Sequence, residues 1–426
     1  MKESFLHYVW ATRQFCSTDL KTTTGEHLVI HKQGSSHQDG GPDFKNGLIQ
    51  IEEELWAGNI EIHIKSSDWF AHNHHLDTTY DSTILHVVFN HDKEVRRTND
   101  TVIPCLELKD KISEKLLNQY HSLTNNSHKI PCEMLVANVS ASIKTLMLES
   151  MAIKRIQEKA SPIYAKLDVS KNDWEEVLYQ EICISFGMRL NKVPFGLLAK
   201  SVPFKLIQQY RNDRTKIEAL YFGCAGYLNA NNKGHYFKKL KTEFAFLQRK
   251  HELTSLDPSL WNFLRLRPPN FPTIRISQLS QLMCTSQTHL RKLISNLTYK
   301  HLYELFRVDA SEFWSNHYTF SKKSTRRKKI IGQSTIHTIL INAVIPVLYC
   351  YGLEHNDFEL QEKCLSLLEQ LPPEKNTVTN YFRSLNFPIE NSLQSQGVLQ
   401  LHNKNCIFKA CLDCSIGHNI LKENTL

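Results

Sequence analysis

Residues 41–69, GPDFKNGLIQIEEELWAGNIEIHIKSSDW, predict two neighbouring antiparallel strands in the N-terminal part of the chain. Asp43 stands at the start of the first strand, NGLIQI, and the second strand, NIEIHIK, carries Glu61, His63 and Lys65. Side chains alternate between the two faces of a strand, so these last three share one face, and three isoleucines occupy the other. A polar row on an otherwise apolar strand carries a desolvation cost. The row therefore indicates a metal ion, a salt-bridge network or exposure to solvent.

The spacing of the acidic residues favours the metal ion. Two carboxylates on adjacent strands can hold one hard cation such as Mg²⁺ or Mn²⁺, with positions left for water and a phosphate oxygen. Asp43 and Glu61 are the predicted ligands, and Glu26 is a further candidate. A cationic or proton-transferring group two residues beyond the second carboxylate would orient the attacking water. His63 occupies that position and Lys65 is the next residue on the same face, so both remain candidates.

This arrangement resembles the PD-(D/E)XK nuclease core. Pro42-Asp43 stands for the PD element and Glu61-Ile62-His63 for the (D/E)XK element, with histidine where the pattern has lysine. The predicted order of elements, helix, strand, strand, strand, helix, strand, also matches that core. The predicted segments are 3–15, 25–34, the two strands described above, 72–81 and 82–90, with a further edge strand at 101–108. The resemblance implies metal-dependent hydrolysis of phosphodiester bonds in DNA or RNA.

The segment HNHHLDTTYD, residues 72–81, is predicted to be a short helix or an ordered loop. In the nuclease core, the helix after the third strand often adds a polar residue and a tyrosine near the phosphate. His74, Asp77 and Tyr80 recur at a spacing of three and would share one helix face. Two alternatives remain open, a transition-metal site at His72, His74 and His75 and a solvated polar loop.

The second part of the chain predicts an α+β fold class, because helical periodicity replaces strand alternation there. The predicted organisation is a nuclease-like α/β domain at 1–110, a linker or crossing segment at 111–139, a helical domain at 140–400 and a Cys-rich segment at 401–426. The segment STIHTILINAVIPVLYCYGL, residues 334–353, is apolar but contains proline and polar residues. It predicts a buried helix rather than a membrane span.

Two basic segments of the helical region predict contacts with nucleic acid, in keeping with the formal net charge of +8. In the first, arginines flank three prolines, and cationic groups on a stiff segment before a helix suit an anion. The second is the run 322–329, with six basic residues. The alternatives are ties to acidic neighbours for the first segment and a solvated loop for the second. The candidate contacts are Arg265, Arg267, Arg275, Lys322, Lys323, Arg326 and Arg327.

The C-terminal segment contains the ligand types of a second metal site. Cys406, Cys411 and Cys414 follow His402 at short spacings. This set predicts either structural Zn²⁺ or, given a fourth ligand elsewhere in the chain, an iron–sulfur cluster. The alternative is reduced thiols packed in a terminal helix.

The composition indicates a cytoplasmic protein without membrane segments. No apolar run approaches the ~20 residues that span a bilayer, and the first residues, MKESFLHYVWATRQF, lack the features of a signal peptide. The 11 cysteines are scattered without a disulfide framework, which favours a reducing compartment.

Motifs along most of the chain are similar to those of a bacterial family, the domain-of-unknown-function family 2851. The similarity rests on FLHYVW (5–10), GPDF (41–44), WAGNIEIHIKSSDW (56–69), YDSTILHVV (80–88), NDWEEVLY (172–179), IEALYFGCAGYL (217–228), RLRPPNFPTIRISQL (265–279), FWSNHY (313–318) and CLDCSIG (411–417). Membership implies no activity, so the expected function follows from residues 41–86. We expect a metal-dependent nuclease. The alternatives are a non-catalytic nucleic-acid-binding protein on a degenerate nuclease core and a structural or interaction protein.

Overall fold

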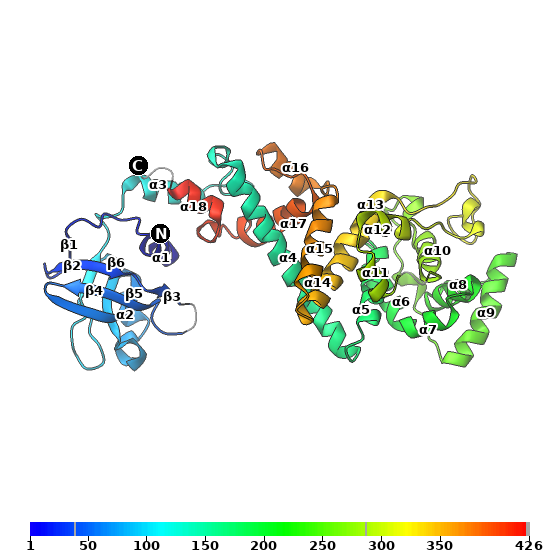
Figure 1. Cartoon of the computed structure of the whole chain (residues 1–426), viewed down its shortest axis with the longest axis horizontal. Helices are drawn as coiled ribbons and strands as arrows, with labels where there is room; N and C mark the ends of the chain where they lie inside the picture. Colours follow the sequence, from blue (N-terminus) through cyan, green and yellow to red (C-terminus); the bar gives the residue numbers. More distant parts are fainter. Residues whose placement is uncertain (38–39, 286–287, 423–426) are drawn as a thin grey trace. The chain divides into compact units, whose positions relative to one another are not determined.

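The computed structural model describes residues 1–37, 40–285 and 288–422, and the chain divides into two compact units. The first unit combines Met1–Met147 with Leu401–Leu426, and the second is Leu148–Gln400. A mixed sheet forms the centre of the first unit, and helices form the second (Figure 1). The predicted α+β class is confirmed.

The sheet has the strand order β1-β2-β4-β5-β6-β7, with β3 paired to β4. Strands β2, β4 and β5 form an antiparallel meander, whereas β5, β6 and β7 run parallel to one another. The parallel step from β5 to β6 needs a crossover, which consists of α2 and two 3₁₀ turns. The strands are β1 (Leu20–Lys21), β2 (His27–Lys32), β3 (Ser35–Ser36), β4 (Phe44–Ile51), β5 (Glu54–Lys65), β6 (Thr83–Asn90) and β7 (Cys105–Glu107).

A bulge at the start of β4 sets the position of Asp43. The pairing passes from Phe44↔Ile60 to Gly47↔Gly58, so β4 uses three residues where β5 uses two. The two facing glycines are required here, because a Cβ on Gly47 would lie 2.7 Å from the Ile60 side chain and one on Gly58 would lie 2.6 Å from the Ser82 carbonyl oxygen. Bulges redirect neighbouring side chains, and Asp43 immediately precedes this one.

Several elements differ in extent from the sequence prediction. The first helix, α1 (Glu3–Ala11), ends four residues early, where Arg13 takes a φ of 53°. The last strand, β7, begins after Pro104, which has no N–H for the sheet. The predicted helix at 72–81 is instead α2 (Asp68–Ala71) followed by two 3₁₀ turns, His74–Leu76 and Thr78–Tyr80. Asp77 separates these turns with an extended backbone and is exposed, so it does not share a helix face with His74 and Tyr80.

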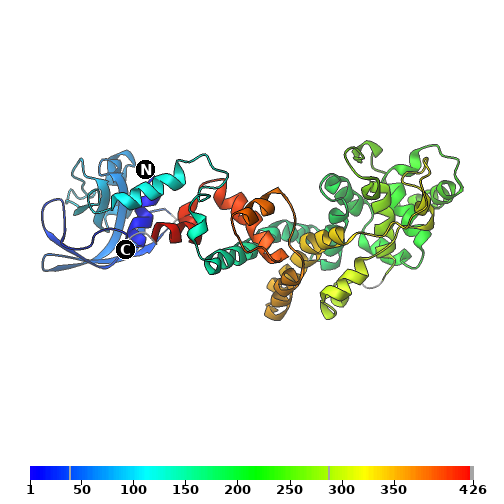
Figure 2. The ribbon, with the colours of Figure 1, turned by 90° about the horizontal axis from the view of Figure 1, so that it is seen from above.

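The C-terminal residues complete the first unit. Helix α18 (Ser415–Lys422) packs beside α3 (Glu114–Thr124), as the two views in Figures 1 and 2 show. The 3₁₀ turn Cys411–Asp413 contacts α1. The α18 side chains of Ile416, Ile420 and Leu421 are at most 4% exposed. The C-terminal segment therefore contributes core residues to the unit whose sheet is formed by the N-terminal segment.

The second unit is built around a large aromatic and aliphatic core. Its helices are α4 (Ala141–Val169, which begins in the first unit), α5 (Trp174–Phe186), α6 (Lys192–Ser201), α7 (Phe204–Tyr210), α8 (Arg214–Cys224), α9 (His235–His251), α10 (Pro272–Met283), α11 (Leu290–Ser295), α12 (Tyr299–Phe306), α13 (Gln333–Ile339), α14 (Ile345–Glu354), α15 (Phe358–Gln370), α16 (Thr377–Ser384) and α17 (Ser392–Leu401, whose last residue belongs to the first unit).

One helical stretch of the second unit, Gln333–Glu354, is long and apolar enough to cross a membrane by length and composition. It includes α13 and α14, and 78% of its most apolar window is buried inside the structure. This burial is what a core helix shows, in agreement with the sequence prediction for 334–353.

Candidate active site

Two carboxylates from adjacent strands are held together by reciprocal contacts with the backbone. The amide of Asp43 donates to Glu61 Oε2 at 3.0 Å, and the amide of Ile62 donates to Asp43 Oδ2 at 3.0 Å. Glu61 is 4% exposed, whereas the Asp43 side chain is 22% exposed. The bulge in β4 and the register of β5 therefore bring the two predicted acidic ligands together at one place on the sheet.

A chain of imidazoles lies beside these carboxylates. His63 follows Glu61 on the same face of β5, and its Nδ1 lies 2.8 Å from His86 Nε2 on the parallel strand β6. The other ring nitrogen of His63 lies 3.1 Å from His72 Nδ1 at the end of α2. His63 and His86 are at most 1% exposed. Each ring nitrogen of His63 is thus engaged by another imidazole.

His74 contacts both the acidic and the aromatic part of this site. Its Nε2 lies 3.3 Å from Glu61 Oε1, without the alignment of a hydrogen bond, and its ring lies against that of Tyr80 with the centroids 3.8 Å apart. The 3₁₀ turns of the crossover thus bring the two predicted residues, His74 and Tyr80, to the Glu61 carboxylate.

The electrostatic environment differs from one site residue to the next. Burial raises the pKa of the Glu61 carboxyl, contact with His74 lowers it, and repulsion from Asp43 raises it again, with a net increase. Burial and the charges of His74, His72 and His7 lower the pKa of His63 to about 3. His63 is therefore a neutral imidazole at pH 7, able to donate a lone pair to a metal but weak as a base.

His7 is a site residue that the sequence analysis did not single out. It lies on α1, with Nε2 3.3 Å from Asp43 Oδ2 and 3.9 Å from Glu3 Oε1. Burial alone would lower its pKa, but contact with Asp43 and the charges of Glu3 and Glu61 raise it above the ordinary value. The available signal was the pair Glu3 and His7, one helical turn apart on the polar side of an otherwise buried helix.

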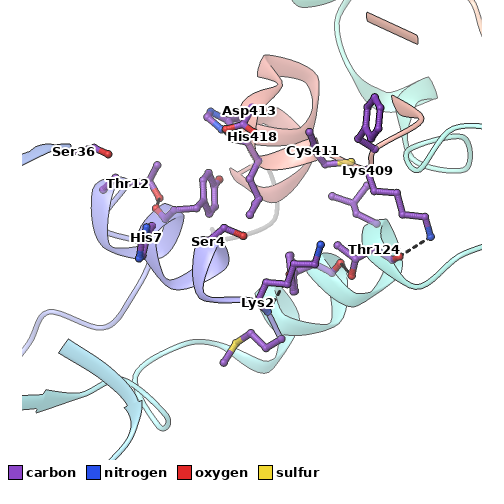
Figure 3. A pocket seen from close by; sticks show the side chains of 18 of the residues that line it. Lys2, Ser4, His7, Thr12, Ser36, Thr124, Lys409, Cys411, Asp413 and His418 are labelled. Atoms are coloured by element: carbon purple, nitrogen blue, oxygen red, sulfur yellow. Dashed lines mark hydrogen bonds between the residues drawn. The ribbon is translucent and has the colours of Figure 1, made fainter. Parts of the chain in front are cut away.

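A cavity of about 680 Å³ opens beside His7 (Figure 3). Its lining comes from α1, from α3, from Ser36, His37 and Phe44, and from the C-terminal segment, which contributes Lys409, Asp413 and His418. Pockets that bind small molecules typically have volumes of about 300–1,000 Å³. His7 lines this space, whereas Asp43, 3.3 Å from His7, is not among its lining residues.

Two further predicted site residues lie apart from this cluster. Lys65 has an exposed side chain at the end of β5, and its backbone amide donates to Asp68 Oδ2 at 2.9 Å. Glu26 is exposed in the turn between β1 and β2, where its Oε2 accepts hydrogen bonds from Thr22 at 3.0 Å and Thr24 at 2.8 Å. Neither contacts Asp43 or Glu61 among the described residues.

Oxygen and nitrogen donors lie side by side in this site, although neither Asp43 nor Glu61 belongs to a group of three ligands within 4.8 Å of one another in the described part of the chain. Oδ1 of Asp43 accepts no hydrogen bond from any described residue, and Glu61 Oε1 has only the imidazole contacts of His63 at 3.7 Å and His74. The ring nitrogens of His63, His72 and His74 all lie within 4.8 Å of one another. Carboxylate oxygens suit Mg²⁺ and Mn²⁺, and imidazole nitrogens suit zinc and other transition metals. Of the three histidines predicted at 72–75, His75 turns away toward Phe70.

The predicted basic contacts in the second unit fall into two groups. Arg275 is 3% exposed, and its guanidinium donates to Gln278, Asn270 and Thr335 within the unit. This guanidinium is therefore committed to the core. The other six, which are exposed, are Arg265, Arg267, Lys322, Lys323, Arg326 and Arg327.

The exposed run 322–329 is anchored at its C-terminal end. Lys329 is 5% exposed and donates to the carbonyl oxygens of Trp314 and Ser315, and its position fixes the loop. Arg326 pairs with Glu312 at 2.7 Å on the surface. The run is therefore a solvated basic loop that is held at one end.

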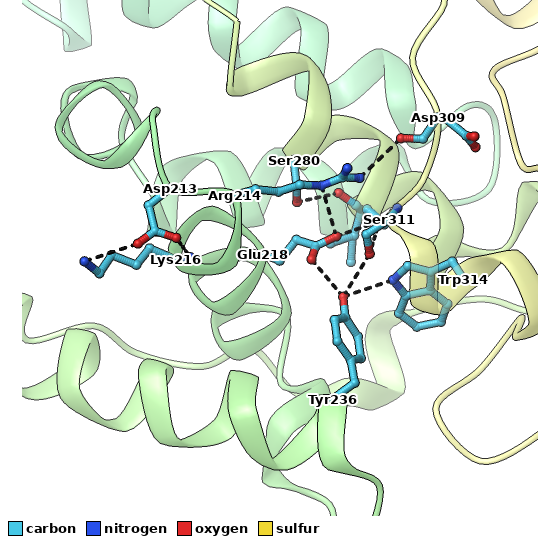
Figure 4. A network of polar contacts seen from close by, with 11 residues as sticks. Asp213, Arg214, Lys216, Glu218, Tyr236, Ser280, Asp309, Ser311 and Trp314 are labelled. Atoms are coloured by element: carbon cyan, nitrogen blue, oxygen red, sulfur yellow. Dashed lines mark hydrogen bonds and ion pairs between the residues drawn. The ribbon is translucent and has the colours of Figure 1, made fainter.

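A buried polar network in the second unit is structural (Figure 4). Glu218 on α8 is 3% exposed, accepts hydrogen bonds from Tyr236 at 2.9 Å and Ser277 at 2.7 Å, and lies 3.9 Å from Arg214. Trp314 donates to the same tyrosine at 3.3 Å. Since both carboxylate oxygens are satisfied by the protein, this network ties helices together and offers no open position to a ligand.

The C-terminal candidates for a second metal site are three cysteines, which are buried or half-buried, and His402, which contacts its neighbour Asn403. Cys411 and Cys414 are buried at the two ends of a 3₁₀ turn, and Cys406 is half-buried at the end of a π-helical turn, His402–Cys406. The Nδ1 of His402 lies 3.0 Å from the side chain of its neighbour Asn403.

The fold and the site define an α+β protein with a carboxylate–histidine cluster on a mixed sheet. The chain belongs to the family described as protein of unknown function (DUF2851), whose match spans residues 3–377. Comparison with curated proteins and with solved structures gives no match.

Proposed function

We propose that the protein is a metal-dependent phosphodiesterase that acts on nucleic acid, with Asp43 and Glu61 as the central ligands. The observation that carries the proposal is the pair of reciprocal backbone contacts that holds these two carboxylates together beside imidazoles, one of which, His7, lines a cavity. Two neighbouring carboxylates repel each other when both are ionised. A divalent cation bound between them would remove that repulsion.

The order of elements supports the same proposal. Helix α1, the antiparallel strands β2, β4 and β5, the helical crossover and the parallel strand β6 follow one another as in the PD-(D/E)XK pattern. Asp43 stands at the start of the middle strand of the meander and Glu61 on the next one. The crossover is much shorter than a full helix, which is where the chain departs from the pattern.

Different residues of the site would bind the cation and transfer the proton. Asp43 and Glu61 would hold the cation, with His72 and His74 as the imidazoles available beside them. When bound, such a cation acidifies its water and neutralises charge on the phosphate. His7 holds or releases a proton at Nε2 beside the cavity, because the charge of Asp43 keeps its pKa above the ordinary value.

His7 therefore takes the place of the pattern's lysine in our proposal. His63 occupies the lysine position in sequence, but it is buried, neutral and engaged at both nitrogens. Lys65 is exposed at the strand end. Among the residues that the structure describes, His7 alone combines contact with a carboxylate, a raised pKa and a position on the cavity wall.

The exposed basic residues of the second unit support nucleic acid as the substrate class. Arg265 and Arg267 flank the proline-rich segment, and the run 322–329 adds further cations on an anchored loop. Contacts of this kind with phosphates would give binding that weakens steeply with salt. They carry no information on base sequence.

The decisive test is cleavage of labelled single- and double-stranded DNA and RNA with Mg²⁺, Mn²⁺ or Zn²⁺. Asp43→Asn and Glu61→Gln should lower cleavage to background, and His7→Gln should lower it by about 100-fold, the usual contribution of a proton-transferring group. Glu26→Gln is the matched control, an exposed carboxylate on the same sheet that should leave cleavage unchanged. Wild-type protein that cleaves none of these substrates with any of the cations would refute the proposal.

One observation favours a second candidate, a nucleic-acid-binding protein without catalysis. The lysine of the (D/E)XK pattern is replaced by His63, which is inaccessible and paired with two other imidazoles. In that case the protein would bind nucleic acid with strong salt dependence, while Asp43→Asn and His7→Gln would change neither binding nor any cleavage.

A further inference from the structure

The loop after α3 brings a fourth cysteine to the C-terminal thiols. Cys132 is 9% exposed and lies in a tight turn in which its carbonyl oxygen accepts the amides of Leu135 and Val136 at 2.9 Å and 2.8 Å. The 3₁₀ turn that follows, Val136–Asn138, packs against α18. In sequence, this cysteine is separated from the other three by the whole second unit.

Hydrogen bonds fix the loop of Cys132 against the segment between Cys406 and Cys411. The Nζ of Lys409 donates to the carbonyl oxygens of Thr124 and Asn126, each at 2.7 Å, and Figure 3 shows the first of these contacts. The side chain of Asn126 then donates to the carbonyl oxygen of Pro131 at 2.8 Å. Residue 131 directly precedes Cys132, so two successive polar contacts tie the two cysteine-bearing segments together.

The first turn of α18 packs closely against Cys411 and Cys414. Cys414 precedes α18, and burial raises the pKa of its thiol, while hydrogen bonds from the amides of Gly417 and Ile416 to the sulfur limit that rise. Gly417 packs so closely that a Cβ there would lie 2.1 Å from the carbonyl oxygen of Cys411. Backbone amides that point at sulfur stabilise a thiolate, the form that binds metals.

The segments that carry the four cysteines are neighbours, because the 3₁₀ turn Cys411–Asp413 contacts both the π-helical turn His402–Cys406 and α18, and α18 contacts the turn Val136–Asn138 that follows Cys132. Burial, followed by repulsion from Cys414 and Cys411, raises the pKa of Cys132 to about 12. Burial also raises the pKa of Cys406, and Cys132, Cys414 and Cys411 add to that rise. All four cysteines are free thiols. Four thiols brought together in this way, without disulfides, have the ligand number of a tetrathiolate metal centre.

We propose that Cys132, Cys406, Cys411 and Cys414 ligate one iron–sulfur cluster, with Cys132 as the ligand that the C-terminal motif lacks. The spacing favours a cluster over zinc. A tetrahedral Zn²⁺ with Zn–S bonds of about 2.3 Å brings its sulfurs to ~3.8 Å from one another. No three of these sulfurs are among the ligand groups gathered within 4.8 Å in the described part of the chain. A four-iron cluster binds each thiolate at a different iron and therefore spaces the sulfurs more widely than one zinc ion does.

Such a cluster would have a structural consequence. It would cross-link the loop after α3 to the C-terminal segment, which contributes Lys409 and His418 to the wall of the cavity beside His7. The cluster would fix the C-terminal segment to the rest of the first unit. This inference does not depend on the proposed hydrolysis, since its ligands are distinct from Asp43 and Glu61.

The test is the metal content of the full chain purified without oxygen. We expect iron and acid-labile sulfide in equal amounts and a broad visible absorption that bleaches on reduction with dithionite. Cys132→Ser should lose the iron, the sulfide and the absorption. Cys105→Ser is the matched control, a buried thiol of the same unit on β7, and should keep all three.

A second variant keeps the test valid if Cys132→Ser fails to fold. Cys406 is the least buried of the four, so Cys406→Ser should fold, as judged by circular dichroism, and should still lose the cluster. One zinc ion per chain in place of iron and sulfide would overturn the cluster. Full iron content in Cys132→Ser would overturn the ligand set, and folded wild-type protein without iron after anaerobic purification would overturn the proposal as a whole.

Discussion

The buried imidazole pair His63 and His86 makes the first unit sensitive to acid. Both side chains are at most 1% exposed, and each ring is held by the other at 2.8 Å. Burial, with repulsion from the neighbouring histidines, lowers the pKa of His63 from 6.5 to about 3. Burial also lowers the pKa of His86 well below its ordinary value. The folded state therefore binds fewer protons at this pair than the unfolded chain does.

The sign and size of the effect follow from this difference in bound protons. Stability rises with pH wherever the unfolded state binds more protons, so it is lost as pH falls from about 6.5 toward 3. The full shift of His63 corresponds to about 5 kcal/mol, of which about 2 kcal/mol is lost by pH 5. His86 contributes in the same direction.

Native-state hydrogen exchange measures this loss in the first unit alone. The opening free energy of amides in β5 and β6 should fall between pH 7 and pH 5 by about 2 kcal/mol or more in protein freed of divalent cations with EDTA. His63→Gln keeps a polar side chain but cannot ionise, so the part of this pH dependence that His63 contributes, about 2 kcal/mol, should disappear, whereas the part from His86 should remain. His31→Gln, an exposed histidine on β2, is the control and should retain it. Equal pH dependence in wild-type protein and His63→Gln would refute the reasoning.

Three further results are expected. Arg275→Met should lower the stability of the second unit by about 2–4 kcal/mol in calorimetry, because its buried hydrogen-bond partners lose their donor. The same change should leave the salt dependence of nucleic-acid binding unaltered, whereas removing the exposed Arg267 should reduce its slope by about one phosphate contact. The fragment 1–147 should lack fixed tertiary structure by NMR, because it lacks the buried side chains of α18, each worth about 1.5–3 kcal/mol. A peptide of residues 401–426 added to it should restore dispersed signals.

The sequence was sufficient where periodicity and local chemistry decide the structure. Alternation predicted the strand that carries Glu61 and His63, and the apolar run 82–90 predicted β6 almost to the residue. The face opposite the polar row was expected to be the buried one. The structure buries both faces of β5 at Glu61 and His63, since helices α1 and α2 pack against this strand. The helical pattern from about residue 140 onward likewise predicted the second unit.

The sequence was insufficient where residues far apart in the chain converge. His7 joins Asp43 only because α1 packs on β5, and no spacing within either segment encodes that contact. Cys132 reaches the C-terminal thiols through the fold of a loop that had been read as a linker. Arg275 looked like its exposed neighbours in sequence. It is buried because α10 begins at Pro272 and turns this residue into the core.

Because of the cavity, loss of the proposed cysteine centre should affect the proposed hydrolysis, whereas loss of the hydrolytic residues should not affect the cysteine centre. Its wall includes His7 from α1 and Lys409, Cys411 and His418 from the C-terminal segment. A metal centre at the cysteines would hold that wall in place, so its loss should open the cavity and weaken substrate binding without altering Asp43 or Glu61. Loss of Asp43, by contrast, removes a cation ligand and leaves the four thiols untouched. Cys132→Ser should therefore show a cleavage defect that consists of weaker substrate binding, with the rate at saturating substrate retained. That result would mean that the cysteine centre stabilises the cavity wall and takes no direct part in catalysis.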